Sequence, residues 1–145
     1  MNVVIQKMQV KEFWSFIDET QKRLEDWVRK NKADINYECC GFACNVFYRI
    51  LSDWKILERC GEDDIDDVMR ITCLKVRGVS HDVMEFFGSF FKDPTHMQFN
   101  PPLTKDEYSY GYFYDNDKYD CEPIFTDDEI LKVCKEIRPE LYEDE

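Results

Sequence analysis

The sequence lacks any long hydrophobic run. No stretch of about 18 apolar residues is present, and the opening residues MNVVIQK lack the long apolar segment of a signal peptide. We therefore expect a soluble, cytoplasmic protein that has no membrane partner. Gly, Ser and Pro are nowhere dense enough to form a linker, and no internal repeat is visible. We expect residues 1–145 to form a single domain.

Basic residues are scarce. Lys and Arg number 19 against 31 Asp and Glu, which gives a formal charge of −12. This charge repels a phosphate backbone, so we do not expect a nucleic acid partner. Hydrophobic residues make up 43% of the chain and aromatic residues 15%, which is too much for a disordered protein. An acidic surface is consistent with solubility or with a basic protein partner.

Metal-binding and disulfide patterns are also missing. The seven cysteines are odd in number and irregularly spaced, which argues against a disulfide framework and favours reduced thiols. No Cys-x-x-Cys pair suggests a zinc site. The acidic runs at 62–67 and 115–117 lack the glycine and glutamate positions of a calcium-binding loop. We expect no metal and no other cofactor.

The hydrophobic pattern predicts an α+β fold in which N-terminal helices pack on a small antiparallel sheet. Helical spacing is visible before and after a stretch of turn formers that ends at Gly41, so that Cys44 is expected near a helix amino terminus. Thr126 and Glu129 are spaced as a capping box for a last helix that ends before Pro139. The predicted helices cover about 10–32, 44–57, 63–70 and 126–138, and a first strand covers 71–77.

The most informative segment is a predicted hairpin over residues 81–95. In a three-residue connection centred on Phe87, His81 and Asp93 would stand directly opposite each other and share one face. Such a pair is useful beside a cysteine, because Asp fixes the imidazole tautomer while His removes the thiol proton. Cys44, 37 residues before His81, is the best candidate for this thiol.

The order of these motifs carries a resemblance to a known family. Residues 41–47 (GFACNVF), 80–85 (SHDVME) and 91–95 (FKDPT) resemble the Cys, His and Asp motifs of the transglutaminase-like superfamily, which has a papain-like fold. Arylamine N-acetyltransferases are similar in order. The resemblance covers about residues 41–95 and implies that Cys44 is the nucleophile, His81 the base and Asp93 its orienter. Glu85 also fits this pattern, in a structural role.

The predicted chemistry is that of a thiol-dependent hydrolase or acyl transferase acting on an amide or peptide bond. A helix amino terminus lowers a cysteine pKa and offers free N–H groups to an oxyanion. A second oxyanion donor is expected from Asn36, with Tyr37 as an alternative. Protease, deamidase and transferase share the acyl-enzyme step, so the sequence does not separate them. The expected substrate is a protein or peptide, and the acidic composition of the chain is compatible with a basic one.

Several alternatives stay open. Cys40 is the alternative nucleophile and His96 the alternative base. Cys44 is also explained as a small buried hydrophobic residue, and Asp93 before Pro94 as an ordinary turn residue. The alternative function is a non-enzymatic acidic binding protein, of the inhibitor or immunity type, that covers a basic partner surface.

Overall fold

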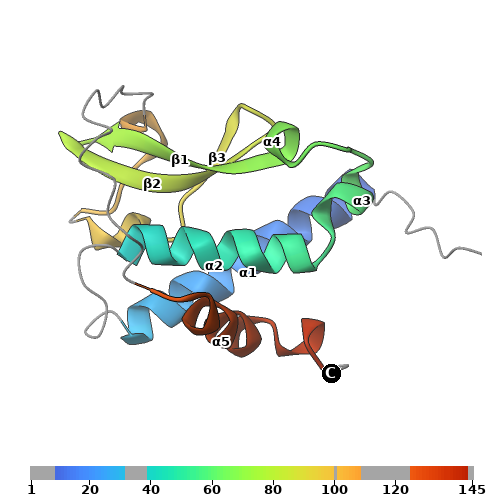
Figure 1. The fold of residues 1–145 in the computed structure, drawn as a ribbon. Helices are drawn as coiled ribbons and strands as arrows, with labels where there is room; N and C mark the ends of the chain where they lie inside the picture. The colour runs from blue at the N-terminus through green and yellow to red at the C-terminus, as the bar shows by residue number, and fades with distance from the viewer. Residues whose placement is uncertain (1–8, 32–38, 100, 109–124, 144–145) are drawn as a thin grey trace, which may run out of the picture.

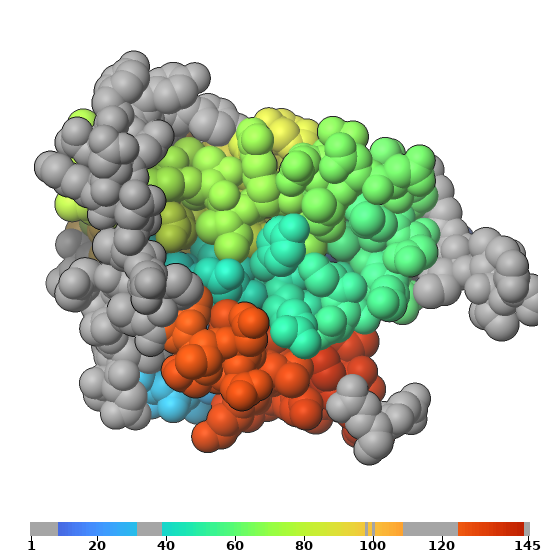
Figure 2. Space-filling view, viewed as in Figure 1, coloured from blue at the N-terminus to red at the C-terminus, as the bar shows by residue number. Residues whose placement is uncertain are grey.

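A computed structural model describes residues 9–31, 39–99, 101–108 and 125–143. In Figure 1, helix α2 (Cys39–Asp53) lies between a three-stranded sheet and the last helix, α5 (Asp127–Ile137), and α1 (Val10–Asn31) runs behind α2. Figure 2 shows α2 reaching the surface in a band between the sheet and α5. The fold is thus a mixture of helices and an antiparallel sheet, which confirms the predicted α+β class.

Helix α1 is amphipathic and follows the predicted pattern closely. Its buried residues recur every three or four positions, which is the repeat of one helical face. This face packs on the central helix and on α5. No described helix, α1 included, is long and apolar enough to cross a membrane. The buried residues of α1 are Phe13, Ile17, Thr20, Leu24 and Val28.

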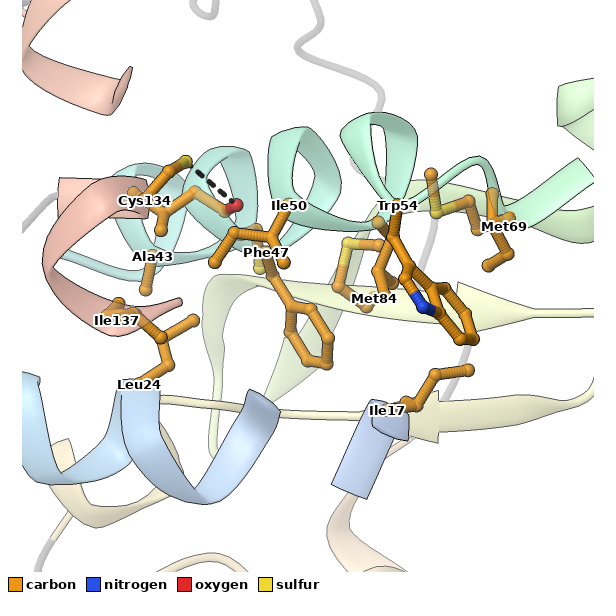
Figure 3. Packing of buried hydrophobic residues seen from close by; sticks show 14 of the residues in the cluster. Ile17, Leu24, Ala43, Phe47, Ile50, Trp54, Met69, Met84, Cys134 and Ile137 are labelled. Carbon is orange, nitrogen blue, oxygen red and sulfur yellow. Dashed lines mark hydrogen bonds between the residues drawn. The ribbon is translucent and has the colours of Figure 1, made fainter. Parts of the chain in front are cut away.

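Helix α2 is buried on more than one side because it has neighbours above and below. Figure 3 shows Leu24 of α1, Ala43 of α2 and Ile137 of α5 gathered at the junction of the three helices. The Cys134 thiol of α5 lies 3.6 Å from the carbonyl oxygen of Val46 in α2. Burying such apolar side chains contributes roughly 1.5–3 kcal/mol each, so this cluster is the main source of stability.

The sheet is an antiparallel meander in the order β1–β2–β3. Strands β1 (Met69–Val76) and β2 (Val79–Phe86) are joined by Arg77 and Gly78, both with positive φ, as in a two-residue hairpin turn. Short helices α3 (Ile56–Cys60) and α4 (Ile65–Val68) precede the sheet. Strand β3 (Phe90–Lys92) completes it.

The register of the second hairpin differs from the prediction. Phe86 pairs with Phe90, so the connection is centred on Gly88 and not on Phe87. Gly88 has a φ of 73°, a conformation that costs glycine little, and this favours the observed centre. With this centre, position 95 and not position 93 would stand opposite position 81. Because the change is two residues, the side chains stay on their predicted face of the sheet.

The C-terminal half contains short 3₁₀ turns and the last helix. Turns η2 (His96–Gln98) and η3 (Lys105–Glu107) follow the sheet, and η5 (Pro139–Leu141) follows α5. The predicted cap is confirmed, because Thr126 Oγ1 accepts a hydrogen bond from the Glu129 amide at 3.2 Å. The helix also ends before Pro139, as predicted.

Candidate active site

His81 and Asp93 form a buried pair at one end of the sheet. Nε2 of His81 lies 2.7 Å from Oδ2 of Asp93, and the two residues are only 3% and 6% exposed. If the observed register continued past Lys92, position 81 would face position 95, which makes Asp93 its diagonal neighbour on the same face. The predicted contact is therefore present, although the two residues are not directly opposite.

The Asp93 carboxylate has a hydrogen-bond donor at each of its lone-pair sites. Oδ1 accepts from the Thr95 amide at 3.0 Å and from the Thr95 hydroxyl at 3.2 Å. Oδ2 accepts from the Tyr108 hydroxyl at 2.6 Å in addition to His81. Since an ionised carboxylate can only accept, Nε2 of His81 carries the hydrogen of this bond. In the neutral ring, Nδ1 is then the nitrogen that can take a proton.

Cys40 is the thiol that interacts with the imidazole. It is the second residue of α2, is partly exposed, and lies close enough to His81 to raise the pKa of the imidazole. Burial alone would lower the pKa of His81. Hydrogen bonding to Asp93 and Cys40, together with the negative charge of these groups, outweighs burial and raises the pKa of His81 to about 9. The amino terminus of a helix carries the positive end of the helix dipole, and this positive end attracts the negative charge of a thiolate.

Cys44 lies deeper in the same helix. The expectation that it sits near a helix amino terminus is wrong, because α2 begins five residues earlier, at Cys39. Its thiol is fully buried and donates to the carbonyl oxygen of Asp82 at 3.4 Å. Burial, and then the charges of Asp93 and Asp82, raise the pKa of Cys44 well above its usual value. This environment keeps the Cys44 thiol protonated.

Gly41 explains why the helix start was misplaced. The sequence pattern treats this glycine as a break, whereas the structure has it inside α2. A Cβ atom at position 41 would lie 3.3 Å from Oδ2 of Asp82, so glycine permits β2 to approach the first turn of the helix closely. This approach brings His81, the neighbour of Asp82, to the amino terminus of α2.

Three further side chains complete the surroundings of His81 and were not predicted. Thr95 and Tyr108 hold Asp93, and the Phe99 ring stands perpendicular to the imidazole with ring centres 5.0 Å apart. The Asp-Pro-Thr sequence contained a signal for Thr95, because Asp side chains commonly bond to the amide two residues later. Nothing in the local sequence pointed to Tyr108 or Phe99.

The remaining predicted residues lie elsewhere. Nε2 of His96 lies 3.0 Å from Oε2 of Glu25 on α1, and His96 does not contact the His81 pair in any described interaction. Buried Glu85 forms a 2.5 Å ion pair with Arg70, the residue opposite it on β1. Asn36 and Tyr37, the predicted oxyanion donors, lie outside the described residues.

A groove of about 690 Å³ runs along β3, beside the His81–Asp93 pair. Asp93 and Tyr108 line this groove, whereas Cys40 and His81 do not. Its size is that of a small-ligand or side-chain pocket. The groove combines aromatic and aliphatic side chains with polar and basic ones, and is lined by Gln21, Ser89, Phe90, Phe91, Lys92, Asp93, His96, Leu103, Lys105 and Tyr108.

Within the described part of the chain, no group of three or more His, Cys, Asp and Glu side chains is arranged to hold a metal ion. No protein-family model matches the chain, no curated protein is similar to it in sequence, and no solved structure matches its fold.

Proposed function

We propose that this protein is a cysteine-dependent hydrolase or acyl transferase that acts on an amide or peptide bond, with a papain-like, transglutaminase-like fold. The nucleophile is Cys40, the base His81 and the orienting residue Asp93. One observation carries the proposal: a single buried imidazole bonds the Asp93 carboxylate at 2.7 Å and lies close enough to Cys40, in the first turn of α2, for this thiol to raise its pKa.

The choice of Cys40 over Cys44 follows from their surroundings. Cys40 is partly exposed and lies close enough to His81 to raise the pKa of the imidazole. Cys44 is fully buried, its thiol is bonded to a backbone carbonyl, and its pKa is raised. A nucleophile has to be accessible and close to its base, and of these two thiols only Cys40 is both.

In the proposed reaction, His81 starts as the imidazolium, in keeping with its pKa of about 9, and holds the proton that Cys40 has given up. The Cys40 sulfur, as a thiolate, attacks the substrate carbonyl carbon. The Asp93 carboxylate stabilises the imidazolium through Nε2. When the tetrahedral intermediate collapses, the C–N bond breaks and His81 protonates the leaving amine. A water molecule or a second amine, deprotonated by His81, then attacks the thioester and releases the Cys40 thiol.

The proposed setting is a reducing compartment such as the cytoplasm, with a protein or peptide as substrate. The six described cysteines are all free, as a thiol enzyme in such a compartment requires. The formal charge of −12 favours substrates or partners that carry basic residues.

The test is limited iodoacetamide labelling at pH 7, followed by peptide mapping. Cys73 is the matched control, because it is more exposed than Cys40 but its pKa is raised, first by burial and then by Asp82. We expect Cys40 to react first, and its advantage over Cys73 to disappear in the His81→Ala variant. Equal or faster labelling of Cys73 in the wild-type protein would falsify the proposal.

A further inference from the structure

The oxygen of Asp93 that meets His81 is shared with a second donor. Oδ2 lies 2.7 Å from Nε2 of His81 and 2.6 Å from the Tyr108 hydroxyl. The other oxygen, Oδ1, receives both of its bonds from Thr95. The two oxygens therefore have different tasks: Thr95 closes the turn through Oδ1, while Tyr108 acts on the oxygen that faces the imidazole.

Tyr108 is suited to act as a permanent donor in this arrangement. Burial, then the charge of Asp93 and the hydrogen bond to it, raise the pKa of Tyr108 far above its usual value. The hydroxyl consequently keeps its proton at physiological pH. A donor on Oδ2 draws negative charge toward itself, so less of that charge is available to stabilise a protonated His81.

We infer that Tyr108 is a positioning residue for the imidazole, which holds Asp93 in place and limits how strongly Asp93 draws a proton onto His81. This inference rests on the proposed function. This limit on the proton affinity of His81 matters for the acyl-transfer step. His81 has to give its proton to the leaving amine, and an imidazolium that binds its proton too strongly is a poor acid.

The other groups around the cluster do not replace this role. Cys40 of α2 raises the pKa of His81, and the charge of Asp93 raises the pKa of fully buried Cys44. Arg77, after β1, forms an ion pair with Glu107 of η3 at 2.5 Å. These two charges act on Tyr108 in opposite directions, Glu107 raising its pKa and Arg77 lowering it. Among the described residues, only Tyr108 and the imidazole donate to Oδ2 of Asp93.

The test uses the fact that the chain has only two histidines. NMR titration of the ring carbons follows both, and His96, bonded to Glu25, serves as an internal reference. In Tyr108→Phe we expect the proton affinity of His81 to rise by about three- to tenfold, because Oδ2 loses its competing charge-assisted bond.

A matched control separates this effect from a general loss of stability. Tyr142 also donates its hydroxyl to a carboxylate, at 2.7 Å from Oδ2 of Asp53, on the far side of α2 from the sheet. Tyr142→Phe removes an equivalent bond and should leave the His81 titration unchanged. An unchanged or lowered proton affinity of His81 in Tyr108→Phe, with the fold intact by circular dichroism, overturns the inference.

If Tyr108→Phe does not fold, site-specific 3-fluorotyrosine at position 108 gives a second test. Fluorine makes the hydroxyl a stronger donor, so the proton affinity of His81 should fall, and an unchanged or raised value overturns the inference. Iodoacetamide labelling keeps this result distinct from the proposed function. A reactive Cys40 with an unmoved His81 titration rejects only the role of Tyr108, whereas an unreactive Cys40 rejects the enzyme.

Discussion

The carboxylate of Asp93 meets the His81 ring with only one of its oxygens, Oδ2, at 2.7 Å. Its second oxygen closes a turn by accepting from the amide two residues later. Asp93 is therefore both a turn residue and a residue of the candidate site. A substitution at Asp93 consequently has two separable effects.

The first prediction concerns the charge of Asp93. Asp93→Asn retains an oxygen that can accept from Thr95 but loses the negative charge facing His81. Since only Cys40 then opposes the effect of burial, the pKa of His81 should fall well below about 9. NMR titration of the two histidines measures it, with His96 as reference. If the variant unfolds before any change in titration is seen, Asp93 is a turn residue alone.

The second prediction concerns stability and pH. In the unfolded chain His81 releases its proton near pH 6.5, whereas the folded protein retains it to about pH 9. The stabilisation is therefore complete below pH 6.5 and is lost as pH rises to 9, by about 3 kcal/mol. Urea unfolding at several pH values measures the slope. Asp93→Asn should reduce this slope, and an unchanged slope in the variant would assign the effect to other groups.

The third prediction separates the two cysteines of α2. Cys44→Ala should lower the free energy of unfolding by about 1 kcal/mol, because it leaves a small cavity in the core. Alkylation of Cys40 should continue at the wild-type rate. Exposed Cys73→Ala is the control for stability and should cost close to nothing. Loss of Cys40 reactivity in Cys44→Ala would show that the reactivity of Cys40 depends on Cys44 and would make Cys44 part of the active site.

The fourth prediction addresses the acidic binding protein as the alternative. Partners are captured from a lysate with the wild-type and Cys40→Ser proteins at low and high salt. A binder that covers a basic surface should lose its partner as the Debye length falls from about 10 Å at 0.1 M to about 3 Å at 1 M salt. An enzyme should retain a substrate complex only in Cys40→Ser. A partner that both proteins hold equally, and that salt releases, contradicts the enzyme proposal.

Local patterns predicted most of the secondary structure. The apolar spacing of α1, the Thr126 cap of α5 and the alternation of β1 each depend on neighbours within a few residues, so they can be read along the chain. The shared face of His81 and Asp93 was predictable for the same reason. The hairpin centre lies one residue further on than predicted, at Gly88 and not Phe87. Such a move changes each cross-strand partner by two residues, so the same side chains still share a face.

The sequence by itself determined the α+β class, the helices α1 and α5, the presence of two hairpins, and the meeting of His81 with Asp93, since local periodicity and turn chemistry decide these. Only the tertiary structure decided which thiol reaches the imidazole. That choice depends on how closely β2 approaches α2 at Gly41, which places Cys40 beside His81 and buries Cys44 under Asp82. Tyr108 likewise reaches Asp93 only through packing between segments distant in sequence, and distant packing leaves no periodic trace in the chain.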